Sequence, residues 1–336
     1  MRFELSEDQQ EIQRTARELL AERSSFTQVR AAGEARREDD ALWAELRDLG
    51  WPGIAVDEAH GGSGLGVIEL AAIAEELGRA VAPVPFLGTA LAGLVVQHDA
   101  SDGDRERWLP GLASGELRGA VTLPGDAVPV PGASDEGLVV VAGADGPQLH
   151  APGSGVAVAV DAIDPTRGHG RVTVAGAAPR DGGPGGGLDR ATIVVAAELV
   201  GVLQRALEAT VDYVKDRKQF GVPVGSFQAV KHEAAQMLRD VEVAKVLVAN
   251  AAWVADAGDQ AKLSEAAALA KAAASAAGRR VSAQAIQLHG GIGFTWEADL
   301  HWLFKRAQID AVLLGGAGHH RQRIARYAVP RAAAAV

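Results

Sequence analysis

Apolar residues recur at helical spacing in the first and last thirds of the chain. The clearest series stands at alternating steps of three and four, at Phe227, Val230, Ala234, Met237, Val241, Ala244, Val248 and Ala251. This spacing predicts one long helix over residues 226–257, packed along a single seam. Near the other end, Ser6 is a candidate N-cap for a helix that starts "EDQQEIQRTARELLAE", and "VIELAAIAEELGRAV" repeats the helical pattern.

The middle of the chain has a different pattern. Short valine-rich runs, "GLVVVAG", "GVAVAVDA" and "RVTVAG", alternate with Gly, Pro and Asp, which predicts strands and turns. We therefore expect an α+β, mainly α, protein with a helical domain over 1–118, a shortened β domain over 119–187 and a helical bundle over 188–336. Because helices and strands do not alternate, a doubly wound nucleotide-binding sheet is disfavoured. The glycine runs "GGSGLG" and "GGPGGG" do not match the dinucleotide motif either.

Composition narrows the classes of function. A hydrophobic content of 48% in 336 residues can fill a core, and the net charge of -10 disfavours nucleic acid as a partner. With no cysteine, disulfides, thiolate nucleophiles and cysteine-ligated metals are excluded. The charged N-terminus does not resemble a signal peptide, and no apolar run reaches the roughly 20 residues of a membrane span. We expect a cytoplasmic protein that does not enter membranes.

Two motifs could bind a cofactor. The first, "DYVKDRKQFG", closes a predicted helix beginning near Ala191, with Lys215, Arg217 and Lys218 in its last turn. These residues fit ordinary helix C-capping, in which cations complement the helix dipole and glycine ends the helix. They also fit a site where Arg217 reaches a phosphate and Phe220 offers its face to a planar ring.

The second motif is "QLHGGIGF" at 287–294. It could be a helix end alone, or it could let a pyrophosphate approach bare backbone at Gly290 and Gly291, with Gln287 as a side-chain donor. We expect His289 to be a packed or surface histidine rather than a ligand. We also expect no metal site at His319 and His320, because neighbours on a helix diverge by about 100° and suit a solvated face.

Three stretches in order resemble the acyl-CoA dehydrogenase family: "DLGWPGIAVDEAHGGSGLGVIELAAIAEELGRA", "DRKQFGVPVGSFQAVKHEAAQM" and "QLHGGIGF". The resemblance spans most of 1–118 and 188–328. It implies an N-terminal helical domain, a middle β domain, a C-terminal four-helix bundle and the cofactor FAD. In that family a glutamate removes the α-proton while FAD takes the β-hydride, and the bundle of one subunit touches the adenosine diphosphate half of a neighbour's FAD. On this basis the expected FAD contacts are Arg217, Phe220, Phe227, Gln228, Gln287, Gly290 and Gly291.

The sequence departs from the family at the catalytic base. Leu314 stands where most members carry the glutamate, and Ala191 stands at the alternative position. Neither side chain can take a proton, so we expect no catalytic residue in this chain. The nearest carboxylates are Asp310, one helical turn before Leu314, and Glu198, two turns after Ala191.

Substrate and flavin binding also depart from the family pattern. Thr192 replaces a frequent arginine, and Lys305-Arg306 replaces the usual Arg-Asp pair. In the middle zone Leu123 replaces a glutamate, and no tryptophan occurs between Trp108 and Trp253, where members carry a strand against the flavin ring. We therefore expect that this chain alone does not hold the isoalloxazine.

These departures favour a degenerate subunit that is inactive by itself. The partner would be a complete acyl-CoA dehydrogenase subunit in an α2β2 heterotetramer, which binds the acyl-CoA and supplies the glutamate. Such complexes resemble the actinobacterial enzymes that act on steroid side-chain CoA thioesters. Two alternatives remain open: a homomeric flavoenzyme with Asp310 or another base, and a structural or regulatory partner that does not touch flavin.

Overall fold

The computed structural model describes residues 5–125, 127–143, 146–174 and 185–334. Its helices are α1 (Glu7–Arg23), α2 (Phe26–Ala35), α3 (Asp40–Asp48), α4 (Val67–Ala80), α5 (Phe86–Asp99), α6 (Asp102–Ala113), α7 (Gly187–Asp216), α8 (Gln228–Asp256), α9 (Gln260–His289), α10 (Leu300–Asp310) and α11 (Ala317–Ala334). Its strands are β1 (Gly119–Thr122), β2 (Val130–Pro131), β3 (Leu138–Gly143), β4 (Gly146–His150), β5 (Ala157–Ala159), β6 (His169–Val172), β7 (Lys218–Gln219) and β8 (Val222–Pro223). The predicted mainly helical α+β fold is confirmed. No helix in these ranges is long and apolar enough to cross a membrane.

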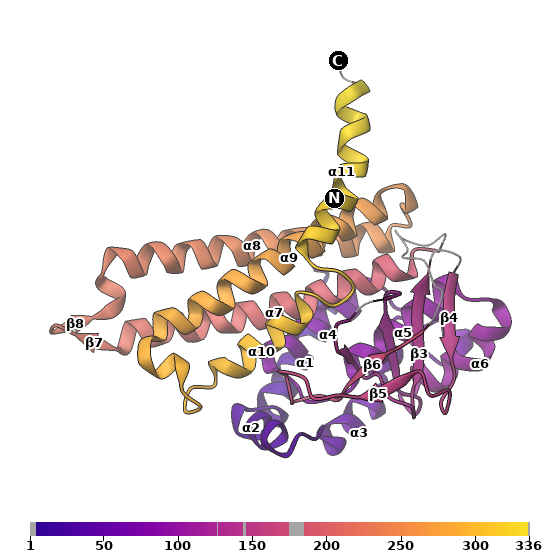
Figure 1. The fold of residues 1–336 in the computed structure, drawn as a ribbon, viewed down its shortest axis with the longest axis horizontal. Coiled ribbons are helices and arrows are strands. Elements are labelled where there is room, and N and C mark those ends of the chain that lie inside the picture. The colour runs from indigo at the N-terminus through magenta and orange to yellow at the C-terminus, as the bar shows by residue number, and fades with distance from the viewer. Residues whose placement is uncertain (1–4, 126, 144–145, 175–184, 335–336) are drawn as a thin grey trace.

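Three long helices, α7, α8 and α9, run alongside one another and form most of the C-terminal region (Figure 1). The predicted long helix over 226–257 is α8, which buries Met237, Val241, Ala244, Val248 and Ala251 on its inner face. The β7–β8 hairpin lies at one end of these helices and the two small sheets lie towards the other end. Helix α7 is central, since it packs against α4, α5, α8, α9 and α10.

The N-terminal helices cover the other side of α7. Ser6 caps α1 as predicted, because its side chain accepts a hydrogen bond from the backbone N–H of Gln9. Helix α4 crosses α7 at very short range through two glycines. A Cβ on Gly78 would lie 2.0 Å from the carbonyl oxygen of Glu198, and one on Gly201 would lie 1.8 Å from that of Glu75. The backbones therefore touch where no side chain fits.

The middle zone forms two three-stranded sheets, ordered β1-β3-β4 and β2-β6-β5. Strand β1 pairs in parallel with β3, with Val121 opposite Val140, and the other pairs in these two sheets are antiparallel. Alternate residues of β3 face different cores, because Leu138, Val140 and Ala142 join the main core while Val139 and Val141 join a small cluster between the sheets. The segment between β5 and β6 carries charged residues back towards α7 and α10.

Candidate functional site

The first predicted cofactor motif ends helix α7, as predicted, and then continues into a hairpin. Helix α7 stops at Asp216, so the expectation that Arg217 and Lys218 lie in its last turn is wrong. Arg217 adopts an extended ψ of 121°, and its carbonyl accepts a hydrogen bond from Val224, which closes the β7–β8 hairpin. The tip residues Phe220 and Gly221 have φ angles of 54° and 80°, as a two-residue hairpin turn requires. A phenylalanine in this region is strained, and such strain concentrates at functional sites.

The second motif lies beside the hairpin. The rings of Tyr213 on α7 and His289 on α9 stack with centroids 4.2 Å apart, which ties the two helix ends together. His289 is buried, as the packed-residue interpretation predicts, and burial lowers the pKa of its ring. Gly290 has φ 62° and ψ -140°, which only glycine adopts readily, and nothing lies within 4 Å of a Cβ built there or at Gly291. Bare backbone is therefore open at this turn.

All seven predicted cofactor contacts gather at this end of the bundle, and all are exposed: Arg217, Phe220, Phe227, Gln228, Gln287, Gly290 and Gly291. The Phe220 side chain is 94% exposed and meets Phe227 edge to face, with ring centroids 6.4 Å apart. Among the residues that the structure describes, Arg217 makes no ion pair. These groups have the chemistry to bind a planar ring and a phosphate.

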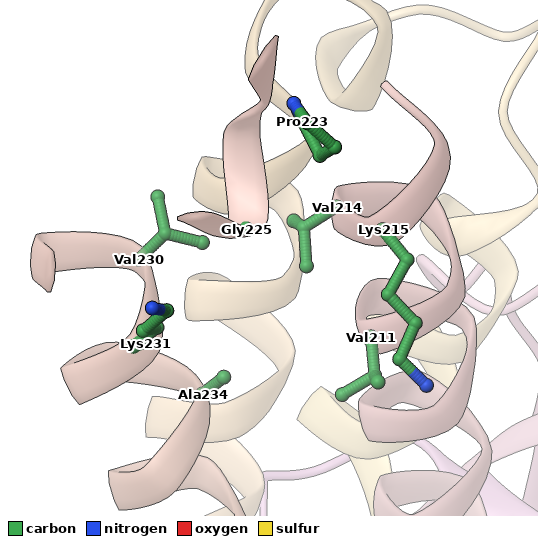
Figure 2. A pocket seen from close by; sticks show the side chains of 8 residues that line it. All are labelled: Val211, Val214, Lys215, Pro223, Gly225, Val230, Lys231 and Ala234. Carbon is green, nitrogen blue, oxygen red and sulfur yellow. The ribbon is translucent and has the colours of Figure 1, made fainter. Parts of the chain in front are cut away.

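A groove of about 390 Å³ lies between the hairpin, the end of α7 and the start of α8 (Figure 2). Its walls are mainly apolar, with Val214 from α7, Pro223 from the hairpin and Val230 from α8. Lys215 and Lys231 stand on opposite walls. An apolar groove with cations at its edges fits the adenosine diphosphate half of FAD, whose ring is planar and whose phosphates are negative.

The positions expected for the catalytic base are closed. The Ala191 side chain is 0% exposed and that of Leu314 is 1% exposed. Leu314 has φ 54°, and its carbonyl accepts a hydrogen bond of 3.0 Å from Nε2 of His320. The expectation of a solvated face for both adjacent histidines is wrong for His320, which is fully buried and whose pKa burial lowers to about 2. Its neutral ring instead fixes the turn around Leu314.

A buried ion cluster occupies the space between α7, α10 and the β5–β6 segment. Its members are Asp164, Arg167, Glu198, Arg306 and Asp310, and none of them is more than 5% exposed. Arg167 enters from the β5–β6 segment and donates to both oxygens of Glu198, at 2.8 and 3.2 Å, and to Asp310. Arg306 of α10 donates to Glu198 at 2.7 Å and to Asp164. Glu198 and Asp310, the carboxylates nearest the expected base positions, are thus paired with arginines.

The electrostatics of the cluster follow from its burial. Burial and the charge of Glu198 raise the pKa of Asp310 to about 7, despite the pairing with Arg167. Burial also tends to raise the pKa of Asp164, but Arg306 and Arg167 hold it below its usual range. A carboxyl with a pKa near 7 could serve as a base, but Asp310 is 0% exposed.

The cavity beside this cluster is too small for an acyl chain. The cavity lined by Arg167, Glu198 and Arg306 has a volume of only about 10 Å³, which is at most enough for one water molecule. The buried Lys271 also holds the end of α10, because its Nζ donates a hydrogen bond of 2.8 Å to the backbone carbonyl of Asp310. The arrangement favours a structural role for Glu198 and Asp310 over proton transfer.

Comparison with known proteins agrees with this architecture. Residues 6–116 match the acyl-CoA dehydrogenase N-terminal domain, and residues 185–329 match the acyl-CoA dehydrogenase C-terminal domain. The acyl-CoA dehydrogenase IpdE2 of Mycobacterium tuberculosis is 38% identical over 310 residues, covering 92% of this chain and 93% of that protein. The chain belongs to the acyl-CoA dehydrogenase family. Acyl-CoA dehydrogenases are FAD-dependent flavoenzymes, so FAD is the cofactor of this fold.

Solved structures of acyl-CoA dehydrogenases share the whole fold. The Tcur3481-Tcur3483 steroid ACAD matches with a TM-score of 0.81 and 30% identity, over 97% of this chain and 99% of that chain. The ChsE4-ChsE5 complex from Mycobacterium tuberculosis matches with a TM-score of 0.80 and 27% identity, over 97% and 98% of the two chains. Both of these names denote assemblies of two components.

Sequence patterns did not indicate that Asp164 and Arg167 are part of the site. They lie in "DAIDPTRGHG", where Asp, Pro and Gly indicate a turn, and their partners stand up to 143 residues further along the chain. Only the structure shows that this segment of the middle zone brings Asp164 and Arg167 to Glu198 and Asp310.

Proposed function

We propose that this chain is the non-catalytic subunit of a heteromeric, FAD-dependent acyl-CoA dehydrogenase that introduces an α,β double bond into an acyl-CoA. The complete partner subunit supplies the catalytic glutamate and most of the FAD site in an α2β2 assembly. The acyl group is a steroid side chain carried as a CoA thioester. This chain contributes contacts to the adenosine diphosphate half of the partner's FAD.

The observation that carries the proposal is the buried ion cluster around Arg167 and the small cavity beside it. Leu314 and Ala191 offer no base, and both nearby carboxylates are buried in ion pairs with Arg167 and Arg306. A catalytic base must reach the proton it removes, and the cavity of about 10 Å³ leaves no room for a substrate. Chemistry in the assembly is therefore assigned to the other subunit.

The hairpin end supports the second half of the proposal. When bound, FAD accepts the hydride from Cβ of the acyl group. The guanidinium of Arg217 has its donors free to pair with a pyrophosphate oxygen, and Phe220 exposes a ring for the adenine. Gln287 and the open backbone at Gly290 and Gly291 complete the cradle. Because these residues are exposed on this chain, they suit contacts to an FAD that is held mainly by the partner subunit.

The relatives point in the same direction. The matching solved structures include a steroid ACAD of two components and the ChsE4-ChsE5 complex, and the chain covers at least 97% of its own length in both matches. A homomer of this chain would carry Leu314 and Ala191 in every subunit and would therefore have no base at either expected position. The two-component relatives favour a division of labour between unlike chains.

The test is the flavin content of the complex with a complete acyl-CoA dehydrogenase. The chain alone is expected to be colourless, and co-expression is expected to give about one FAD per unlike pair. Arg217→Ala is expected to lower the bound flavin and the dehydrogenase activity. The matched control is Arg239→Ala, an exposed arginine on α8 that pairs with Asp240. Glutamine in place of the partner's glutamate is expected to abolish turnover and keep the flavin.

Each alternative gives a different outcome. A homomeric flavoenzyme that uses Asp310 or another base would purify yellow without a second polypeptide. A structural partner that does not touch flavin would leave flavin content and activity unchanged in Arg217→Ala. Survival of activity after loss of the partner's glutamate would contradict the proposed division of labour.

A further inference from the structure

A second pocket, about 430 Å³ in volume, lies beside the middle of α7. The end of α1, the start of α2, the end of α4 and the middle of α7 enclose it. Three arginines line this pocket: Arg17 from α1, Arg79 from α4 and Arg205 from α7. The FAD contacts proposed above include none of them, so the arginine pocket is a separate site.

Two of the arginines are held in place by carboxylates. Arg17 donates to both oxygens of Glu76, at 3.0 and 2.7 Å, and Arg79 donates in the same way to Glu208. Each pairing uses two of the five N–H groups of a guanidinium, so further donors remain on both. The pairs fix the positions of the cations, which lowers the entropic cost of binding an anion.

The third arginine, Arg205, packs against an aromatic ring. Within the described part of the chain, Arg205 makes no ion pair, and its guanidinium lies over the Phe26 ring at 5.5 Å from the centroid. Three arginines and one carboxylate, Glu76, line the pocket, while Glu208 and Glu75 act on the arginines from outside the lining. Three guanidinium groups thus converge on one hollow in a chain with a net charge of -10.

The shape of the pocket indicates more than a bare ion. Phe26 and Arg205 also line a second hollow of about 290 Å³, which runs along α7 to the stacked rings of Tyr213 and His289. The guanidinium fork matches the oxygens of a phosphoryl group, and an aromatic ring offers a surface to an attached organic body. We propose that the arginine pocket binds the phosphoryl group of an organic phosphate, with the organic part lying over Phe26 towards the second hollow.

Phenyl phosphate is the probe, because it combines a phosphoryl group with a small ring. Isothermal titration of the purified full chain is expected to show saturable binding of phenyl phosphate, weaker binding of inorganic phosphate and none of phenol. Arg205→Gln is expected to raise the dissociation constant at least about tenfold, since a charge-assisted hydrogen bond contributes about 1.5–3 kcal/mol. Added salt is expected to weaken binding.

Two controls separate this site from others. Arg239→Gln removes an exposed arginine elsewhere, and Arg217→Ala alters the proposed FAD contacts, so both are expected to bind phenyl phosphate like the unmodified chain. Binding that Arg205→Gln does not weaken would overturn the proposal. Equal affinity for inorganic phosphate and phenyl phosphate would refute the role of Phe26, and a loss in Arg217→Ala would relocate the binding to the hairpin.

Discussion

Replacing Arg167 with methionine tests whether the buried ion cluster determines the stability of the fold. The Arg167 side chain is 2% exposed, and it is the cation that joins Glu198 to Asp310. Methionine has a similar length and adapts to irregular space, so the cavity left behind is small. The main effect of Arg167→Met is electrostatic: one arginine then faces Asp164, Glu198 and Asp310, of which Asp310 is partly protonated at pH 7 because its pKa is raised to about 7.

Breaking a buried pair by removing one partner costs about 3–5 kcal/mol, because the remaining charge is left uncompensated. We expect the free energy of unfolding to fall by that amount in Arg167→Met. Glu198→Gln alone leaves two arginines with two carboxylates, Asp164 and Asp310, and is expected to cost less. The double variant is expected to be at least about 1 kcal/mol more stable than the sum of the two single losses predicts.

Urea unfolding followed by circular dichroism at pH 7 measures these free energies. The control is Arg37→Met, which removes an arginine that is 74% exposed and pairs with Asp40 three residues away, and which is expected to change stability by less than about 0.5 kcal/mol. A loss below about 1 kcal/mol in Arg167→Met, or strict additivity in the double variant, would refute the electrostatic account.

The remaining predictions concern pH and helix packing. Burial raises the pKa of Asp310 from 3.8 to about 7, so the folded chain holds a proton that the unfolded chain releases, and Asp310 lowers stability increasingly as the pH rises from about 4 to about 7. Asp310→Asn removes this dependence. Urea unfolding at pH 5 and pH 8 should therefore show that the variant gains stability relative to the unmodified chain as the pH rises. The same difference in the free energy of unfolding at both pH values would contradict the raised pKa. Gly201→Ala should lower the melting temperature, because its Cβ would lie 1.8 Å from the carbonyl of Glu75, whereas Gly318→Ala in α11, with open space around it, should not. Equal melting temperatures for the two variants would rule out the close crossing of α4 and α7.

Local patterns predicted much of the fold. The regular apolar steps predict α8 because apolar residues mark the buried face of one helix, although Phe227, the first residue of the series, is the N-cap and is exposed. Ser6 predicts the start of α1 because capping is a contact within four residues. The hairpin at Phe220 was not predicted, since its Gly-Val-Pro sequence fits a helix end equally well. Backbone strain at Phe220 is visible only in three dimensions.

The candidate site could likewise be predicted only in part from the sequence. The proposal that Leu314 and Ala191 stand where relatives carry the base rests on motif positions alone, because a residue type is read from the sequence without coordinates. The burial and ion pairing of Asp310 and Glu198 could not be predicted, since both depend on Arg167, which lies in a turn far from α7 and α10 in the sequence. Sequence shows which groups are available, and packing decides whether they can act.

The long range of the ion cluster has a consequence for the order of folding. Its hydrogen bonds join residues 31, 108, 142 and 143 positions apart, from Arg167–Glu198 to Arg167–Asp310. Contacts so distant in sequence form slowly, because the chain must close large loops before they give any stability. The cluster should therefore assemble late, after α7 and α10 have docked. Substitutions at Arg167 should then accelerate unfolding while leaving the folding rate almost unchanged.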